Sequence, residues 1–157
     1  MLKKIIFIAL IFKILVSCGF TPTLKVTEKT NDLNLINYEF VNTSYNSRNI
    51  LRNLLTTVNQ DEAKYLVKLK VIDSESAVNI ESNGSVVEYR FEALIEYELF
   101  DALSNVLMHS SQTRGLANYD VSDSEYSNDL IKKEAEKTAV TEALQLMLIT
   151  IQSKINM

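Results

Sequence analysis

A long alternation of apolar and charged residues between Val87 and Leu99 constrains the fold of this chain more than any other feature. One set of alternate positions holds Val87, Tyr89, Phe91, Ala93, Ile95, Tyr97 and Leu99. The other set holds Glu88, Arg90, Glu92, Glu96 and Glu98, with Leu94 as the exception. Successive side chains of a strand point to opposite faces, so this pattern predicts a half-solvated antiparallel strand. The apolar face of its sheet must then be covered by another layer.

Three further segments predict the rest of the sheet. Residues 33–41 predict a short first strand, and residues 63–72 alternate in the same way, with a possible continuation through Ile80. Asn83-Gly84 is a typical hairpin turn, and residues 101–105 form the next turn. Residues 106–119 predict a fourth strand that is rich in small side chains.

Two segments show apolar residues at helical spacing. The first starts after Asn46 or Ser47 and includes Ile50, Leu51, Leu54, Leu55 and Val58. The second is a long helix over residues 130–154, capped by Asn128 or Asp129, whose buried rows are Ile131, Ala135, Ala139 and Ala143, and Val140, Leu144, Met147 and Ile151. Its further apolar residues Leu146, Leu148 and Ile149 predict a second contact.

The order of these elements predicts an α+β fold. We expect a four-stranded, mostly antiparallel sheet with two helices packed on one face, in the order β-α-β-β-β-α. Residues 33–157 would form this single domain.

The N-terminal residues predict an export signal and a lipid anchor. Met1-Leu2-Lys3-Lys4 is a short basic start, followed by the apolar run Ile5–Phe12, and both are typical of a secretory signal. Leu15-Val16-Ser17-Cys18 resembles a bacterial lipobox, in which the cysteine is acylated after cleavage. We therefore expect a lipoprotein signal peptide over residues 1–17, lipidation at Cys18 and a tether over residues 18–32. An ordinary signal peptide with an incidental cysteine is the alternative.

Cleavage before Cys18 would change the charge of the chain. The mature chain, Cys18 to Met157, would have 140 residues with 13 basic and 20 acidic side chains. Such an acidic balance argues against nucleic acid as a partner. It also argues against electrostatic docking of the domain to anionic head groups, so the lipid at Cys18 would be the link to the membrane. Gly19 is not the aspartate that retains lipoproteins at the inner membrane, so the outer membrane is favoured.

The chain offers little for catalysis or metal binding. Its single cysteine excludes an internal disulfide framework, and its single histidine, His109, excludes a histidine cluster. His109 has no nucleophile or orienting acid at a recognisable spacing. We therefore expect no enzyme activity, no catalytic residues, no metal and no cofactor.

Two stretches of sequence resemble the LPS-assembly lipoprotein family (LptE), in its alphaproteobacterial type. The first is the start Cys18-Gly19-Phe20 after the lipobox, and the second is residues 117–126 with the Ala-rich helix Glu134–Ala139. The resemblance implies an outer-membrane lipoprotein that plugs and helps assemble a large β-barrel, the LPS translocon LptD. It also implies contact with lipopolysaccharide through basic side chains, without covalent chemistry.

The candidate lipopolysaccharide-contacting residues are Lys68, Lys70, Arg90 and Arg114. The first three are predicted on the polar face of the sheet, and Arg114 near a strand end. Cationic side chains suit phosphate, although cross-strand pairing with Glu88, Glu92 or Glu96 on a solvated face is the more common role of such residues. A second hypothesis for the whole chain is a free periplasm-facing lipoprotein that binds a ligand for a lipid or small-molecule transport system. Exposure of Leu146, Leu148 and Ile149 would favour a permanent partner, whereas burial would favour the free module.

Overall fold

The computed structural model describes residues 32–122 and 124–156. Its strands are β1 (Ile36–Phe40), β2 (Tyr65–Ile80), β3 (Val86–Asp101) and β4 (Leu107–Asp120), and its helices are α2 (Tyr45–Leu54) and α3 (Glu125–Ile155). Two short 3-10 helices, η1 (Leu33–Leu35) and η2 (Gln60–Glu62), precede β1 and β2. The predicted signal peptide and the predicted acylation site, Cys18, lie outside the described residues.

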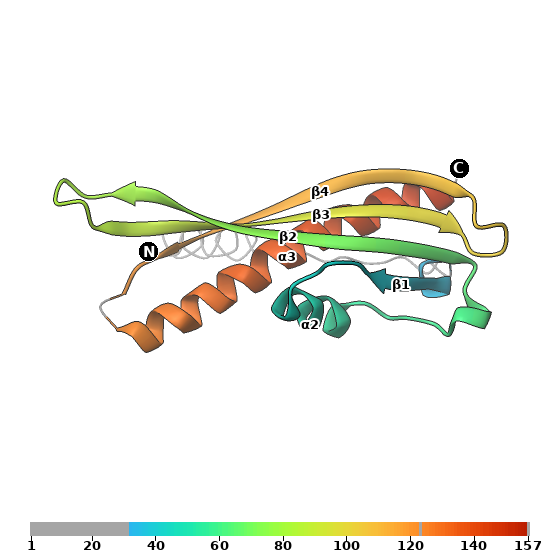
Figure 1. The fold of residues 1–157 in the computed structure, drawn as a ribbon, viewed down its shortest axis with the longest axis horizontal. Helices are drawn as coiled ribbons and strands as arrows, with labels where there is room; N and C mark the ends of the chain where they lie inside the picture. The colour runs from blue at the N-terminus through green and yellow to red at the C-terminus, as the bar shows by residue number, and fades with distance from the viewer. Residues whose placement is uncertain (1–31, 123, 157) are drawn as a thin grey trace, which may run out of the picture.

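The four strands form one sheet in the order β1-β2-β3-β4. β1 pairs with β2 in parallel, whereas β2–β3 and β3–β4 are antiparallel. Both helices lie on the same side of this sheet, and the tip of the β2–β3 hairpin extends beyond α3 at one end (Figure 1). The predicted α+β fold, with its mostly antiparallel sheet, is confirmed.

The core lies between the sheet and the helices, where the alternation predicted it. The odd-numbered residues of β3 from Phe91 to Leu99 are buried, as are Tyr65, Val67, Leu69 and Val71 of β2. Leu51 of α2 and the two expected rows of α3 close the same cluster, except that Ile131 is exposed. No helix within the described part of the chain has the length and apolar run that crossing a bilayer requires.

The close approach of α3 to β4 depends on small side chains. Ser111, Thr113, Gly115 and Ala117 of β4 lie opposite the buried residues Tyr97, Ile95, Ala93 and Phe91 of β3. A Cβ atom added at Gly115 would stand 1.9 Å from the carbonyl oxygen of Ala139. The Thr113 hydroxyl donates a hydrogen bond to the carbonyl oxygen of Ala143 at 2.8 Å. The small residues of β4 therefore allow α3 to pack closely against this strand.

Both helices begin earlier than predicted. Ser44 caps α2 and Ser124 caps α3, each by accepting a hydrogen bond from the backbone N–H three residues on. α2 also ends earlier, at Leu54, because Leu55 is extended and packs against the core from outside the helix. The apolar spacing therefore overestimated the length of the first helix and underestimated the length of the second.

Candidate functional site

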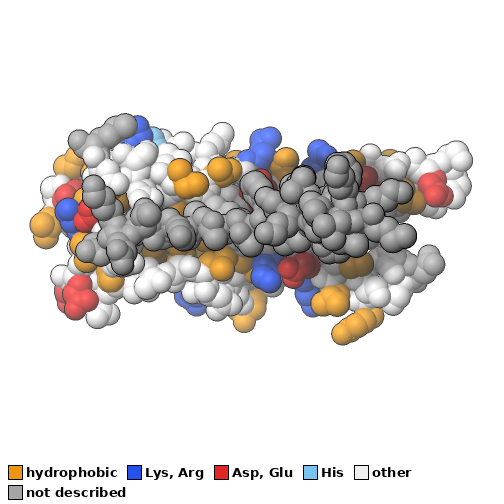
Figure 2. Space-filling model, turned by 180° about the vertical axis from the view of Figure 1, so that it is seen from behind, with side chains coloured by type: hydrophobic (Ala, Val, Ile, Leu, Met, Phe, Trp, Pro, Cys, Tyr) orange, Lys and Arg blue, Asp and Glu red, His pale blue; other side chains and the backbone are white. Residues whose placement is uncertain are grey.

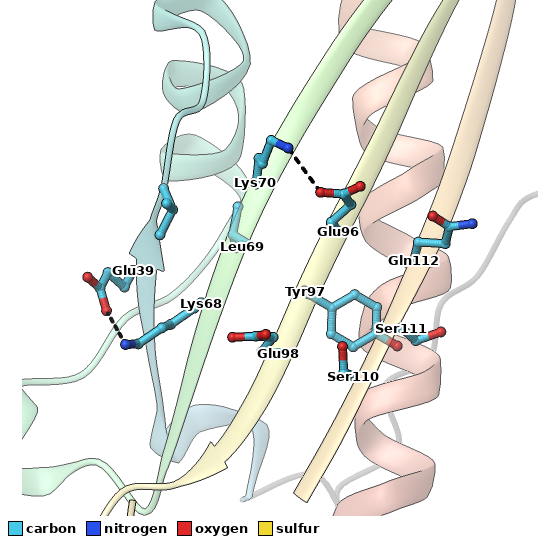
Figure 3. A pocket seen from close by; sticks show the side chains of 11 residues that line it. Glu39, Lys68, Leu69, Lys70, Glu96, Tyr97, Glu98, Ser110, Ser111 and Gln112 are labelled. Atoms are coloured by element: carbon cyan, nitrogen blue, oxygen red, sulfur yellow. Dashed lines mark hydrogen bonds and ion pairs between the residues drawn. The ribbon is translucent and has the colours of Figure 1, made fainter. Parts of the chain in front are cut away.

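The outer face of the sheet carries the four basic candidates. Lys70 of β2 lies directly opposite Glu96 of β3, and its Nζ is 3.1 Å from Glu96 Oε2. Lys68 lies opposite Glu98, but its Nζ pairs with Glu39 of β1 at 3.7 Å. Figure 3 shows both lysines on the side of the sheet that faces away from α3.

Arg90 and Arg114 extend this charged surface towards β4. Arg114 Nε is 2.9 Å from Glu92 Oε1. Arg90 Nε donates to Asn118 Oδ1 at 2.9 Å, and Asn118 in turn donates to Glu88 Oε1. The prediction that Arg114 lies near a strand end was wrong, because β4 extends from Leu107 to Asp120 and places Arg114 opposite Leu94 in its middle.

The structure therefore brings the four residues together on one face and gives each an acceptor. Three of them pair with a glutamate, as the solvated-face interpretation expected. Exposed ion pairs of this kind contribute only about 0–1 kcal/mol each, because water already solvates both partners. An incoming phosphate could therefore replace a glutamate at small cost.

A shallow depression of about 730 Å³ crosses this outer face. All four strands line it, with Glu39, Lys68, Lys70, Glu96, Glu98, Ser110 and Gln112 among the contributors (Figure 3). Its lining is mixed in charge and contains several hydroxyl and amide groups. Such a surface can bind a polar or zwitterionic ligand through hydrogen bonds and ion pairs.

A second polar cluster, which the sequence analysis missed, lies where α2 and α3 meet β2. Asp73 Oδ2 accepts hydrogen bonds from the hydroxyls of Ser44 at 2.8 Å and Ser47 at 2.7 Å. Glu136 of α3 is buried beside it, and its carboxylate accepts a hydrogen bond from Asn46 Nδ2. One signal in the sequence could have indicated this cluster. The buried row of β2 ends at Val71, and the next residue on the same face of the strand is Asp73.

Burial and neighbouring polar groups shift the pKa values of two glutamates, Glu136 and Glu75, in opposite directions. Burial, reinforced by the neighbouring charge of Asp73, raises the pKa of Glu136 above its usual value of 4.5. Burial would also raise the pKa of Glu75. Hydrogen bonds from Lys132, at 2.6 Å, and from Tyr119 outweigh that effect and lower it.

His109 has neighbours that do not form a catalytic arrangement. Its ring centre is 6.0 Å from that of Tyr97, and both Tyr97 Oη and His109 Nε2 are buried without a hydrogen-bond partner among the described residues. Within residues 32–122 and 124–156, no group of three or more His, Cys, Asp or Glu side chains could hold a metal ion.

Comparison with known proteins places the fold among bacterial lipoproteins. No protein-family model and no curated protein matches the sequence. A candidate lipoprotein of Caulobacter crescentus CB15 is similar in structure, with a TM-score of 0.61 and 18% identity over 80% of this chain and 93% of that one. A minor lipoprotein of Acinetobacter baumannii has a TM-score of 0.55 and 11% identity over 79% and 92% of the two chains. An uncharacterized lipoprotein B of Nitrosomonas europaea has a TM-score of 0.52 and 14% identity over 76% and 87%.

Proposed function

We propose that this chain is an outer-membrane lipoprotein, anchored through Cys18, that assembles with and plugs the LPS-translocon β-barrel and assists lipopolysaccharide insertion into the outer leaflet. The shared fold with the Caulobacter lipoprotein, over 93% of that chain's length, supports the lipoprotein part of this proposal. The barrel and lipopolysaccharide part rests on the resemblance of Cys18-Gly19-Phe20 and residues 117–126 to the LPS-assembly lipoprotein family. The lipobox residues Leu15–Cys18 supply the anchor independently of the fold. The proposed role is binding and assembly, without enzyme activity.

Exposed apolar side chains on α3 support a protein partner. Leu146 is 44% exposed and Ile149 is 55% exposed, whereas Leu148 packs against the core. Two of the three residues that were predicted to make a second contact are therefore free of the domain's own core. On the visible part of the face in Figure 2, hydrophobic side chains stand at separate places between polar ones. A partner that covers α3 would bury such residues.

The outer sheet face supports a polar environment for the rest of the domain. Three of its four basic side chains pair with glutamates and Arg90 donates to Asn118, so the face is polar without a large excess of either charge. The lumen of an outer-membrane barrel is polar in the same way. A domain with this surface can therefore sit in such a lumen with most of its basic side chains still paired.

Contact with lipopolysaccharide is proposed at the same face, through Lys68, Lys70, Arg90 and Arg114. Their glutamate partners are on the surface, so phosphate groups of the lipid can compete for them. A variant with all four residues changed to alanine should fold and lose binding of purified lipopolysaccharide. Equal binding by this variant and the parent would end the proposal for these four residues.

Purification of the complex tests the proposal as a whole. C-terminally tagged protein would be isolated from detergent-solubilised outer membranes and its partners identified by mass spectrometry. We expect one large β-barrel in stoichiometric amount, and its loss when Cys18→Ala removes the anchor. Recovery of the folded lipoprotein alone would refute the plug function.

A free ligand-binding lipoprotein is the second candidate, and the depression on the outer face favours it. It predicts that the purified protein carries a small molecule or lipid and has no stable barrel partner. The same purification distinguishes the two candidates, because only the plug requires a barrel.

A further inference from the structure

β4 forms a free edge of the sheet, and this edge is separate from the outer face. β4 is the last strand in the sheet order, and among the described residues no strand pairs with its other side. Exposed strand edges recruit other strands unless charges, prolines or bulges protect them. From Met108 to Leu116, the only charged side chain on this strand is Arg114.

The direction of the backbone groups along this edge follows from one hydrogen bond. The N–H of Leu116 donates to Glu142 Oε2 of α3 at 2.9 Å, so it points away from β3. In an antiparallel ladder alternate residues share this orientation. The pairing of β4 with β3 is regular from His109 to Asp120. Ser110, Gln112 and Arg114 therefore also present their backbone N–H and C=O groups outward.

α3 flanks the same edge with apolar side chains. Glu142, Leu146 and Ile149 follow one another at i, i+4 and i+7 and so share one side of the helix. Because Glu142 reaches the free edge of β4, that side of α3 lies along the edge. Ala139 contacts Gly115 and Ala143 contacts Thr113, so α3 and β4 run in opposite directions. Leu146 and Ile149 consequently flank the first half of β4.

We propose that this edge pairs with the same edge of a second copy of the chain, antiparallel and centred on Gln112. This register brings Leu116 towards Met108 of the second copy, which lies just beyond the regular part of the ladder, and these side chains are 42% and 44% exposed. It places Arg114 opposite Ser110 of the second copy, whose partner in the sheet is Glu98 of β3, so the guanidinium approaches a carboxylate. Centring the pair on Arg114 would instead set two like charges against each other.

The same register gathers the apolar residues of α3. Since Leu146 and Ile149 flank the strand near Gln112, the two copies of this pair meet beneath the two-fold axis. An eight-stranded sheet would result, with the two α3 helices in contact on its inner face. The Glu142 side chain must leave the Leu116 N–H to admit the second strand. This makes Glu142 the residue that protects the edge in the single chain.

Disulfide trapping of the purified full-length protein in detergent tests the pairing. Cys18 is the sole cysteine of the chain, so a Gln112→Cys variant carries one new thiol. Directly opposed residues of antiparallel strands lie within the roughly 4.4–6.8 Å between Cα atoms that a disulfide needs. We expect a covalent dimer as the main product after mild oxidation.

Ser110→Cys is the matched control, because it lies on the same face two residues away. In the proposed register its two copies are offset by four positions, roughly 13 Å, which exceeds the reach of a disulfide. Only a trace of dimer is expected from this variant, and from the parent, which reports any linkage through Cys18. Adding Leu146→Lys to Gln112→Cys should reduce the dimer while circular dichroism stays unchanged.

Absence of a dimer at Gln112→Cys would overturn the pairing, as would equal yields from Gln112→Cys and Ser110→Cys. The experiment uses only the chain itself. Leu146 and Ile149 cannot contact a second copy and the barrel at the same time, so the pairing describes the chain before it assembles with the barrel. Its failure would therefore leave the proposed barrel partner, and the purification that tests it, unaffected.

Discussion

Gly115 is the position where one added methyl group should damage the fold most specifically. A Cβ atom there would lie 1.9 Å from the carbonyl oxygen of Ala139, 2.7 Å from the backbone nitrogen of Ala143 and 2.9 Å from the carbonyl carbon of Ala139. All three are backbone atoms of α3, so no side-chain rotation relieves the overlap. Ordinary contact begins near 3.4 Å, and the helix must therefore retreat by about 1.5 Å.

Overpacking of this kind costs about 1–3 kcal/mol, and sometimes more. Replacing glycine with alanine recovers about 0.4–1 kcal/mol by restricting the unfolded chain. We therefore expect Gly115→Ala to lower the free energy of unfolding by about 2 kcal/mol, a large part of the 5–15 kcal/mol that a typical domain has. For a domain of this size, that loss lowers Tm by about 5–10 °C.

Urea denaturation and thermal melting measure the loss, and Gly84→Ala is the control. Gly84 has φ of +87° in the hairpin turn, and nothing lies within 4 Å of an added Cβ there. Its substitution costs only backbone strain, about 1 kcal/mol. Hydrogen exchange should accelerate in α3 near Ala139–Ala143 for Gly115→Ala alone. A Gly115→Ala protein as stable as the parent would refute the close approach of α3 to β4.

Three further predictions follow from other contacts. Leu51→Ala should lower the free energy of unfolding by about 2–5 kcal/mol in urea denaturation, because Leu51 is fully buried where α2 meets the core. A loss below 1 kcal/mol would contradict that packing. Glu136→Gln should raise Tm at pH 7. The pKa of Glu136 is raised in the folded state, so the folded protein holds the carboxyl proton more tightly than the unfolded chain does. The stability gained in this way is lost as pH rises through the folded pKa, and glutamine, which carries no charge, avoids that loss. Melting curves from pH 4 to pH 8 should show the advantage of this variant shrinking towards acid pH, and a constant difference would argue against the shifted pKa. The third prediction concerns the outer-face residues Lys68, Lys70, Arg90 and Arg114. Changing all four to alanine should lower the free energy of unfolding in urea by no more than about 1 kcal/mol per ion pair. A collapse of the fold would show that these residues are structural.

Much of the fold could be predicted from local patterns. The alternation from Val87 to Leu99 defined both faces of β3, because a period of two residues is a property of the strand itself. The rows Ala135–Ala143 and Val140–Ile151 likewise identified the buried side of α3. Helix boundaries were less well predicted. Several polar residues near the start of each helix are suitable caps, and the sequence does not show that Ser44 and Ser124 are the ones used.

The candidate site was predicted in part. The polar face of β2 and β3 follows from the same alternation, so Lys68, Lys70 and Arg90 were placed correctly. The pairing of Lys68 with Glu39 could not be predicted, because it depends on β1 joining the sheet in parallel beside β2. The neighbourhood of Asp73 and Glu136 was also missed, since these residues are far apart in the chain and meet only when both helices dock.

The sequence by itself determined which side of each strand and helix is apolar, and with it the layered α+β fold. It also contains the contiguous segment Leu15–Cys18, whose resemblance to a lipobox predicts the lipid anchor. Only the tertiary structure decided how closely α3 approaches β4, which carboxylates share a buried junction, and which edge stays free. The physical reason is that periodicity is set by the local geometry of the backbone. Contacts between distant segments depend on the register and docking of whole elements.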